Sequence, residues 1–358
     1  MFGGYVGGLM QSFLPLDRTL GSVPGALVGR LSRIDTGRGR EELFANQLSE
    51  LLTALAARAR VQSITASSAL EGIVVPDKGR AARIIDGSAK GLRSRSEQEF
   101  AGYRNALDYL FTQEWRPLNV GLILHLHRLL FAETPGRGGE FKTSDNLVVD
   151  LLEDGSRSVR FTPVPAVTTA SFVQELVDRY RDGQRLGVHH PILLIGLFVL
   201  DLLTIHPFDD GNGRVTRALT NALLTEAGYG IGRYVSLEQL IAESSEEYYA
   251  CLLQSTHGWH ENEHDVWPWL EYFVGLLTDA YQRFEVGAAS SRSKGSKQDR
   301  VREFVLNHGP EFFAIGDVRS ALPGISDQTI RLALDALRND GRIRSEGTGR
   351  GAKWHRLR

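Results

Sequence analysis

The stretch HPFDDGNGRVTR, residues 206–217, places a tight backbone turn, two carboxylates and two arginines at the start of a helix. Gly211, Asn212 and Gly213 let the backbone turn with its N–H groups pointing inward, and the dipole of the following helix also favours negative charge there. Phosphate is the natural occupant of such a concavity. The Asp210 carboxylate beside it would be repelled by phosphate oxygens unless a divalent cation bridged them. The stretch therefore predicts a nucleotide site with Mg²⁺.

The side chains around this turn fit the same chemistry. Arg214 and Arg217 lie three residues apart on one helix, so both guanidinium groups point toward the same ligand. His206, just upstream, can accept the proton of a hydroxyl that approaches the phosphorus. We interpret Phe208 as a core residue that fixes the loop. The alternative, a Gly-Asn turn that caps a helix, does not need a His, a Phe and an acid at fixed offsets.

This stretch resembles the signature of the Fic family, H-x-F-x-D/E-G-N-G-R-x-x-R, and matches it at every fixed position. The resemblance implies a mainly α Fic-type core with a β-hairpin flap, and transfer of AMP from ATP to a Ser, Thr or Tyr hydroxyl of a target protein. It implies His206 as the catalytic base, Asp210 as the Mg²⁺ ligand and Arg217 as the group that binds the γ-phosphate. The nucleotide-binding residues that it implies are Phe208, Asp209, Gly211, Asn212, Gly213, Arg214, Arg217 and Tyr249, the last beside the adenine.

A second segment, residues 57–72, has the pattern of a helix that ends at a left-handed glycine, Gly72. Ser67 and Glu71 are four residues apart and share a face of that helix. The string S-x-x-x-E-G resembles the inhibitory motif of many Fic proteins, which implies that Glu71 pairs with Arg217 and blocks the γ-phosphate. We expect a bidentate pair. A solvent-facing helix end is the alternative, and the same glutamate could instead orient a water that removes AMP from a modified target.

Composition is typical of an intracellular enzyme. The chain has 358 residues and a net charge of −2, which allows two or three domains and points to no partner. Its one cysteine, Cys251, excludes an intrachain disulfide and favours a reducing compartment, so we expect a cytoplasmic protein. Residues 1–13 lack a signal-peptide pattern. The longest apolar run, residues 192–205, is shorter than the roughly 20 residues of a membrane span, so we expect a core helix there.

Apolar spacing predicts helices over 41–70, 97–111, 120–132, 167–182 and 191–205. The main strand signals lie in residues 139–165, on both sides of a polar turn at 153–156. The resemblance implies that this hairpin is the flap, which binds a target segment as an added strand. Lys142 stands where relatives often have Arg. A surface hairpin without a target role is the alternative.

Residues 245–270 contain further aromatic and ionisable side chains. We expect Tyr248 in the core, whereas Tyr249 is the residue that the resemblance places beside the adenine. A cluster of His and Glu suggests a metal site, but a glycine interrupts it and a polar loop explains it better. The members of this cluster are His257, His260, Glu261, Glu263 and His264.

The C-terminal part has the pattern of a separate small domain. Residues 287–297, GAASSRSKGSK, have the composition of a linker. Three helical patterns and two alternating segments follow in 298–358, and they resemble a winged helix-turn-helix (α+β). Residues 341–358 carry six Lys or Arg against one acid, and Gln328, Thr329 and Arg331 would lead the third helix into a DNA groove. Asp327 and Asp335 weaken that interpretation, so DNA and protein remain equal candidates as partner.

Together these patterns predict an N-terminal helical region over 1–115, a catalytic core over 116–286, the linker and the small domain. The leading hypothesis is an AMP transferase that Glu71 inhibits, and the alternative is a DNA-binding regulator whose Fic domain senses nucleotide. Transfer of phosphocholine or of the γ-phosphate is less favoured, because a kinase-like relative usually replaces the second glycine of the signature, which is intact here as Gly213. A homodimer is compatible with the sequence, and no membrane partner is expected.

Overall fold

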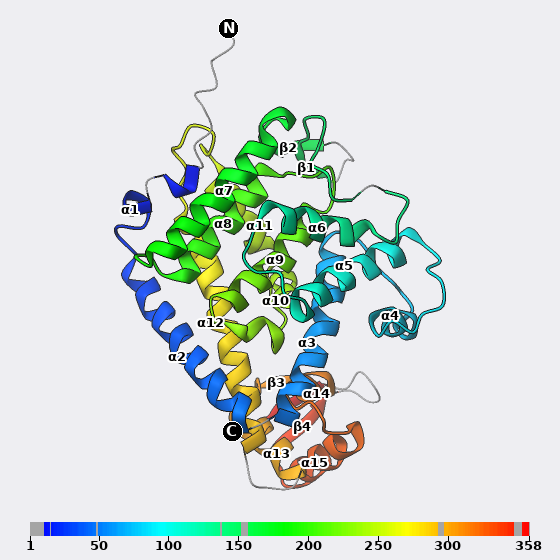
Figure 1. Cartoon of the computed structure of the whole chain (residues 1–358). Helices are drawn as coiled ribbons and strands as arrows, with labels where there is room; N and C mark the ends of the chain where they lie inside the picture. Colours follow the sequence, from blue (N-terminus) through cyan, green and yellow to red (C-terminus); the bar gives the residue numbers. More distant parts are fainter. Residues whose placement is uncertain are drawn as a thin grey trace.

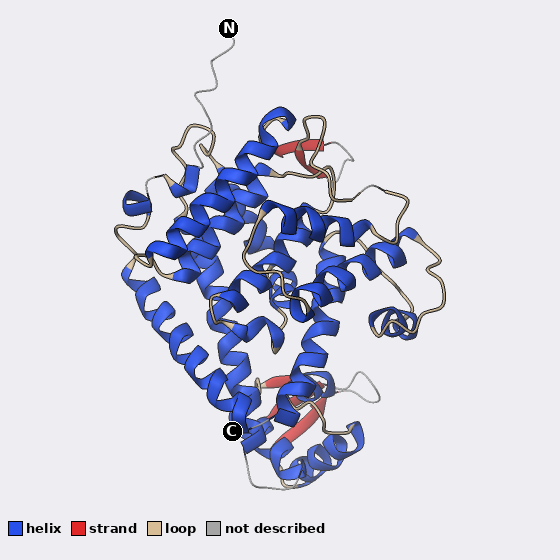
Figure 2. Ribbon diagram, viewed as in Figure 1, coloured by secondary structure: helices blue, strands red, loops and turns tan. Residues whose placement is uncertain are grey.

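The structure of the chain is a computed structural model that describes residues 11–14, 16–47, 49–136, 138–151, 157–292, 297–346 and 353–357. Helices dominate it, and short strands occur in two places (Figure 1, Figure 2). The predicted mainly α fold class is thereby confirmed. No described helix has both the length and the apolar composition that crossing a lipid bilayer requires.

Helix α8 (Pro191–Ile205) forms the centre of the core. It starts with proline at its first turn, where the missing N–H costs no bond, and its side chains are buried nearly all round. Helices α7 (Ala166–Leu186), α9 (Asn212–Glu226) and α12 (Trp267–Arg292) contact it. A rigid, fully buried helix therefore leads directly into the 206–217 loop.

The N-terminal helices cover one side of this core. They are α1 (Leu16–Thr19), α2 (Gly25–Gln47), α3 (Ser49–Leu70), α4 (Lys78–Ile85), α5 (Arg95–Thr112) and α6 (Val120–Phe131), after a 3-10 turn η1 (Gln11–Phe13). The helix predicted over 41–70 is in fact shared between α2 and α3. Helix α2 contacts α12, whereas α3 contacts α5 and α10 (Leu237–Glu243), and residue 48 between them lies outside the described part of the chain.

Between α9 and α12 the chain consists of short helical elements. It forms the 3-10 turn η2 (Gly230–Arg233), α10 and α11 (Ser245–Thr256).

Two histidines of the suggested metal cluster have separate partners: His260 Nε2 lies 2.7 Å from Thr162 O, and His264 Nε2 lies 2.9 Å from Ser12 Oγ. Within the described ranges no group of three or more His, Cys, Asp or Glu could hold a metal ion.

The flap is an antiparallel pair of β1 (Val148–Leu151) and β2 (Arg157–Phe161), with Val149 opposite Val159. It lies at the top of Figure 1, beside the start of α7. The turn predicted at 153–156 lies outside the described residues.

The C-terminal domain has a hydrophobic cluster of its own, at the bottom of Figure 1. Its elements are α13 (Lys297–Glu303), a π-helical turn η3 (Phe304–His308), β3 (Phe312–Ala314), α14 (Ile315–Ala321), α15 (Asp327–Asn339), β4 (Ile343–Glu346) and β5 (Lys353–Arg356). The sheet order is β3-β5-β4, so a third strand joins the two that were predicted. A three-residue strand is too short to show alternation.

The segment predicted as a linker differs from the expectation in its first half. Helix α12 continues to Arg292, and Ala288 within it is fully buried in the main core. Burial against the core outweighs the weak helix preference of the glycine and the serines here. Residues 293–296 lie outside the described part of the chain.

Candidate active site

The 206–217 loop is held by its own side chains and by its neighbours. Phe208 is buried and stacks on His127, with ring centroids 3.8 Å apart and nearly parallel planes. The Asn212 side chain accepts a hydrogen bond from Phe208 N (2.9 Å) and donates one to Phe208 O (2.8 Å). Asn212 thus closes the loop, and only its backbone N–H is left for a ligand.

An amide nest follows, made of the backbone N–H groups of Asn212, Gly213 and Arg214. Gly211 caps α9 in the left-handed region, with φ 83°, and the first bond within the helix runs from Val215 N to Gly211 O. The three preceding N–H groups therefore have no partner within the helix. Together with the helix dipole, these N–H groups are able to hold an anion.

His206 ends α8 in a left-handed conformation, with φ 50°. Its half-buried ring has Nδ1 3.3 Å from Leu203 O, and the tautomer that satisfies this contact leaves a lone pair on Nε2. Burial, helped by the positive charge of Lys142, lowers the pKa of His206 to about 4. The imidazole is therefore neutral at pH 7, as a proton acceptor must be.

His127 on α6 is a site residue that the sequence analysis did not identify. Its Nδ1 accepts a hydrogen bond from Gly139 N (2.9 Å), so Nε2 carries the proton and donates to Asp210 O at 3.1 Å. Burial lowers the pKa of His127 to about 4, which keeps this tautomer at neutral pH. An isolated His in an apolar helix gives no sequence signal for such a role.

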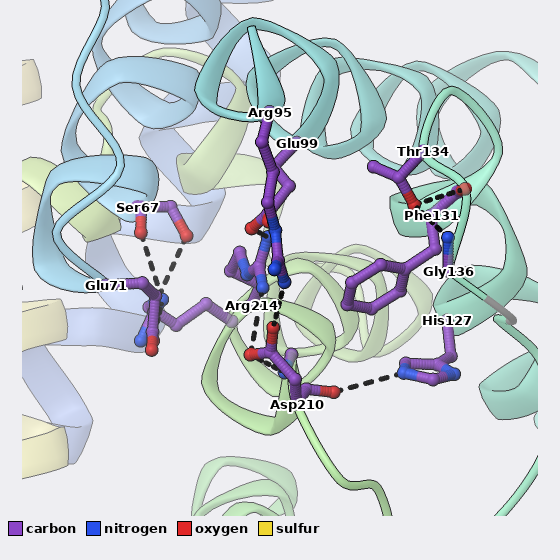
Figure 3. Close-up of polar contacts among 12 residues, drawn as sticks. Ser67, Glu71, Arg95, Glu99, His127, Phe131, Thr134, Gly136, Asp210 and Arg214 are labelled. Atoms are coloured by element: carbon purple, nitrogen blue, oxygen red, sulfur yellow. Dashed lines mark hydrogen bonds and ion pairs between the residues drawn. The ribbon is translucent and has the colours of Figure 1, made fainter.

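The carboxylate of Asp210 belongs to a charge ring of four side chains, shown in Figure 3: Asp210, Arg214, Glu99 and Arg95. Arg214 Nη2 lies 3.1 Å from Asp210 Oδ1, and Arg214 Nη1 lies 2.8 Å from Glu99 Oε2. The Arg214 side chain is only 1% exposed. Arg214 was expected to hold phosphate through its side chain, but in the structure its guanidinium orients Asp210. Glu99 and Arg95 were not predicted, because they lie far from the loop in the sequence.

Arg217 contacts the end of α3, as the sequence predicts. Arg217 Nη2 lies 2.7 Å from Glu71 Oε1 and 3.1 Å from Ser67 O, while Nε donates to Ser67 Oγ at 2.9 Å. The prediction of a bidentate pair is wrong. Nε and Nη2 of the guanidinium both bond to Ser67, so Glu71 contributes one oxygen. Gly72 ends the helix with φ 72°, the left-handed conformation predicted for it.

The Glu71 carboxylate also lies against the amide nest. A Cβ placed on Gly213 would come within 2.4 Å of Glu71 Oε1 and 2.8 Å of Arg217 Nη1. Only glycine leaves room for this arrangement. The contact of Arg217 with Ser67 and Glu71, which is the predicted inhibitory contact, therefore covers the start of α9.

Lys142 connects the flap region to the loop despite being Lys rather than Arg. Its Nζ donates to Ile205 O (3.2 Å) and to Asn146 Oδ1 (2.8 Å), and its backbone N–H donates to Pro207 O (2.9 Å). Asn146 in turn donates to Phe208 O at 3.0 Å. Burial lowers the pKa of Lys142 to about 8. Asn146 is a further residue that the sequence did not indicate.

The remaining predicted residues lie at the edges of the site. Tyr249 is half-buried, and the Arg160 guanidinium of β2 lies 4.9 Å from its ring centre. Tyr248 is buried in the core, as expected. Asp209 is exposed.

The chain is similar in sequence to known proteins. The Fic/DOC family model matches residues 117–224. The chain is 27% identical over 208 residues to protein adenylyltransferase fic-1 of Caenorhabditis elegans, which is 57% of this chain and 36% of that protein. It is 28% identical over 134 residues to protein adenylyltransferase Fic of Drosophila erecta, 37% of this chain and 25% of the relative. The chain thus spans only 36% and 25% of the length of these curated relatives.

Solved structures show the same fold. A Fic family protein from Desulfovibrio desulfuricans G20 has a TM-score of 0.62 at 22% identity, over 94% of this chain and 97% of that chain. Fic-1 from C. elegans has a TM-score of 0.59 at 23% identity, over 80% and 79%. Residues 117–224 of this chain therefore match the Fic/DOC family model, and the chain shares the fold of these solved Fic structures.

Proposed function

We propose that this chain is a protein adenylyltransferase, which transfers AMP from ATP to a hydroxyl of a target protein. The observation that carries the proposal is a neutral imidazole, His206, that joins the buried helix α8 to the loop bearing an amide nest and Asp210. The curated relatives are named protein adenylyltransferases, which supports the same reaction.

In this reaction the target oxygen attacks the α-phosphorus of ATP. His206 Nε2 accepts the hydroxyl proton, the bond from the α-phosphorus to the bridging oxygen breaks, and pyrophosphate leaves. The amide nest stabilises the negative charge of the phosphates. Once Arg217 has left Glu71, its guanidinium is the candidate partner of the γ-phosphate. Tyr249 borders the adenine in this proposal, and Asp209 lies at the exposed rim.

Asp210 is the candidate Mg²⁺ ligand. Its side chain is 50% exposed, and a single carboxylate beside phosphate oxygens is a donor set that Mg²⁺ accepts. His127 and Arg214 would hold Asp210 in place, through its backbone oxygen and Oδ1. When bound, Mg²⁺ would neutralise charge on the phosphates.

We further propose that the inhibitory contact keeps the wild-type chain in a low-activity state. Glu71 takes the guanidinium of Arg217 and occupies space directly over Gly213, where phosphate oxygens would approach the amide nest. A carboxylate there also repels phosphate. The same carboxylate is a candidate for orienting water in the reverse reaction, the removal of AMP.

The flap is the candidate binding surface for the target. Leu147, Val149 and Val159 are large apolar side chains that stay exposed on or beside its strands. An added target strand would cover them and pair with the main chain. Lys142 and Asn146 would then fix the distance between that strand and His206.

The test uses the Glu71→Gly variant with ATP labelled at either the α- or the γ-phosphate, in a cell lysate as the source of targets. We expect the α-label on protein, at a rate well above wild type, and none with the Glu71→Gly, His206→Ala double variant. Glu246→Gly, the same change at an exposed glutamate of α11, is the matched control and should leave the rate at the wild-type level. Transfer of the γ-label alone contradicts AMP transfer, and equal rates for wild type and Glu71→Gly contradict the inhibition.

DNA binding by the C-terminal domain is a second candidate function. The acids that argued against it are paired: Arg319 bonds to both oxygens of Asp327 (2.7 and 2.6 Å), and Arg338 lies 3.0 Å from Asp335. Arg331 stays exposed on the same helix. Fluorescence anisotropy with labelled duplex DNA over a range of salt concentrations tests it, because phosphate contacts weaken steeply as salt rises.

A further inference from the structure

The charge ring contains one largely exposed cation, Arg95, whose guanidinium faces the Asp210 carboxylate. We propose that Arg95 is a built-in counter-ion of Asp210 that a divalent cation must displace, so that it sets the cation concentration at which the site loads. The inference rests on the proposed function, in which Asp210 holds Mg²⁺.

The two oxygens of Asp210 differ in how firmly they are held. Oδ1 accepts hydrogen bonds from Gly211 N (2.6 Å) and from the buried Arg214 (3.1 Å). Oδ2 faces Arg95 Nη2 at 3.7 Å, beyond hydrogen-bond distance. A metal ion would therefore bind at Oδ2, where it meets the positive charge of Arg95.

Arg95 contacts both carboxylates of the ring, as Figure 3 shows. Its Nε lies 2.5 Å from Glu99 Oε1, and Glu99 is buried between Arg95 and Arg214. The Arg95 side chain is 75% exposed, against 1% for Arg214. Of these two cations only Arg95 has room to turn away from Asp210 while it keeps its bond to Glu99.

The position of Arg95 in its helix also supports a role as counter-ion of Asp210. It is the first residue of α5, after the N-cap Ser94, where the helix dipole disfavours a cation. Helix stability therefore does not explain an arginine here. Its favourable partners are the carboxylates of Glu99 and Asp210, both of which belong to the ring.

The effect should be modest, because exposed ion pairs are weak. Removal of the competing charge is expected to tighten cation binding by about two- to fivefold. The probe is Mn²⁺ with ADP, followed by the relaxation enhancement of water protons. ADP lacks the γ-phosphate that Arg217 would bind, and the same Arg217–Glu71 contact is present in every variant that is compared.

We expect Arg95→Gln to bind Mn²⁺ in the ADP complex more tightly than wild type, with Arg95→Lys in between. Arg93→Gln is the matched control: it removes the same charge two residues away, and it should equal wild type. The described contact of Arg93 is a backbone hydrogen bond to Glu97, 2.7 Å long. Thermal unfolding of each variant checks that the fold is retained.

Two failures are distinguishable. If wild type binds Mn²⁺ with ADP and Asp210→Asn does not, but Arg95→Gln is unchanged or weaker, the counter-ion inference is overturned and the metal role of Asp210 stands. If wild type shows no ADP-linked Mn²⁺ binding that Asp210→Asn removes, the metal role in the proposed function is overturned as well.

Discussion

At the residue scale, His206 shows how burial prepares a side chain for chemistry. A non-glycine residue with positive φ is strained, by about 1 kcal/mol or more, and persists only where the surroundings hold it. Here the His206 backbone N–H bonds to Leu202 O at 3.1 Å, and the ring contacts Leu203 O. The strain sits at the junction between the rigid α8 and the amide nest.

The pH dependence of the Glu71→Gly variant follows from this burial. The pKa of His206 is lowered to about 4, so the neutral form persists as pH falls from 8 to 5. We expect kcat/KM for AMP transfer to stay level over that range and to fall only near pH 4. Steady-state rates across pH 3.5–8, with circular dichroism as a check on folding, measure it.

An acid limb centred near pH 6.5 would show instead that the base has an ordinary imidazole pKa.

The lowered pKa values of His206 and His127 also affect the stability of the fold. Because the unfolded state binds a proton at His206 and His127 below about pH 6.5 and the folded state does not, stability falls as pH is lowered through that range.

At the element scale, the close crossing of α5 and α6 brings the charge ring and His127 to the same loop. Gly102 makes this crossing possible, since a Cβ there would lie only 1.9 Å from Leu130 O. Helix α5 carries Arg95 and Glu99, and α6 carries His127. Separation of the two helices would therefore disturb both supports of Asp210.

We predict that Gly102→Ala lowers the free energy of unfolding by about 1–3 kcal/mol or more, because the added methyl group meets backbone that cannot yield. Urea unfolding measures the change. Gly29→Ala is the matched control: Gly29 lies in α2 with open space around its Cα, and alanine should stabilise the helix by up to about 1 kcal/mol. Similar values for the two variants would contradict the close crossing.

At the scale of the whole molecule, two separate hydrophobic clusters divide the chain. One surrounds α8, and the other lies within the C-terminal domain. The site residues belong to the part built around the first cluster. Helix α12 extends toward the second cluster, and Val286 packs against it.

We expect a chain that ends at Arg292 to fold and to bind ADP with unchanged affinity. Scanning calorimetry should show that the truncated chain loses one unfolding transition of the full chain and keeps the other. Loss of ADP binding, or a single transition in the full chain that disappears on truncation, would show that the two parts depend on each other.

The features that depend on local spacing could be predicted from the sequence. The bounds of α8 coincide with the predicted 191–205, the left-handed Gly72 ends its helix, and Gly211 to Gly213 form the turn at the start of α9. The contact of Arg217 with Ser67 and Glu71 was also predicted, but through a family motif rather than through spacing. A helix repeat or a glycine turn is set by neighbouring residues, so it can be read from them.

The surroundings of Asp210, by contrast, depend on how the helices pack in the folded molecule. Glu99 and Arg214 are 115 residues apart, and His127 lies 83 residues from Asp210. Such contacts form because helices pack side by side, and the residues involved have no periodic pattern in common. The same packing turned Arg214 from an expected phosphate ligand into a buried support, since its guanidinium meets two carboxylates that local spacing could not foresee.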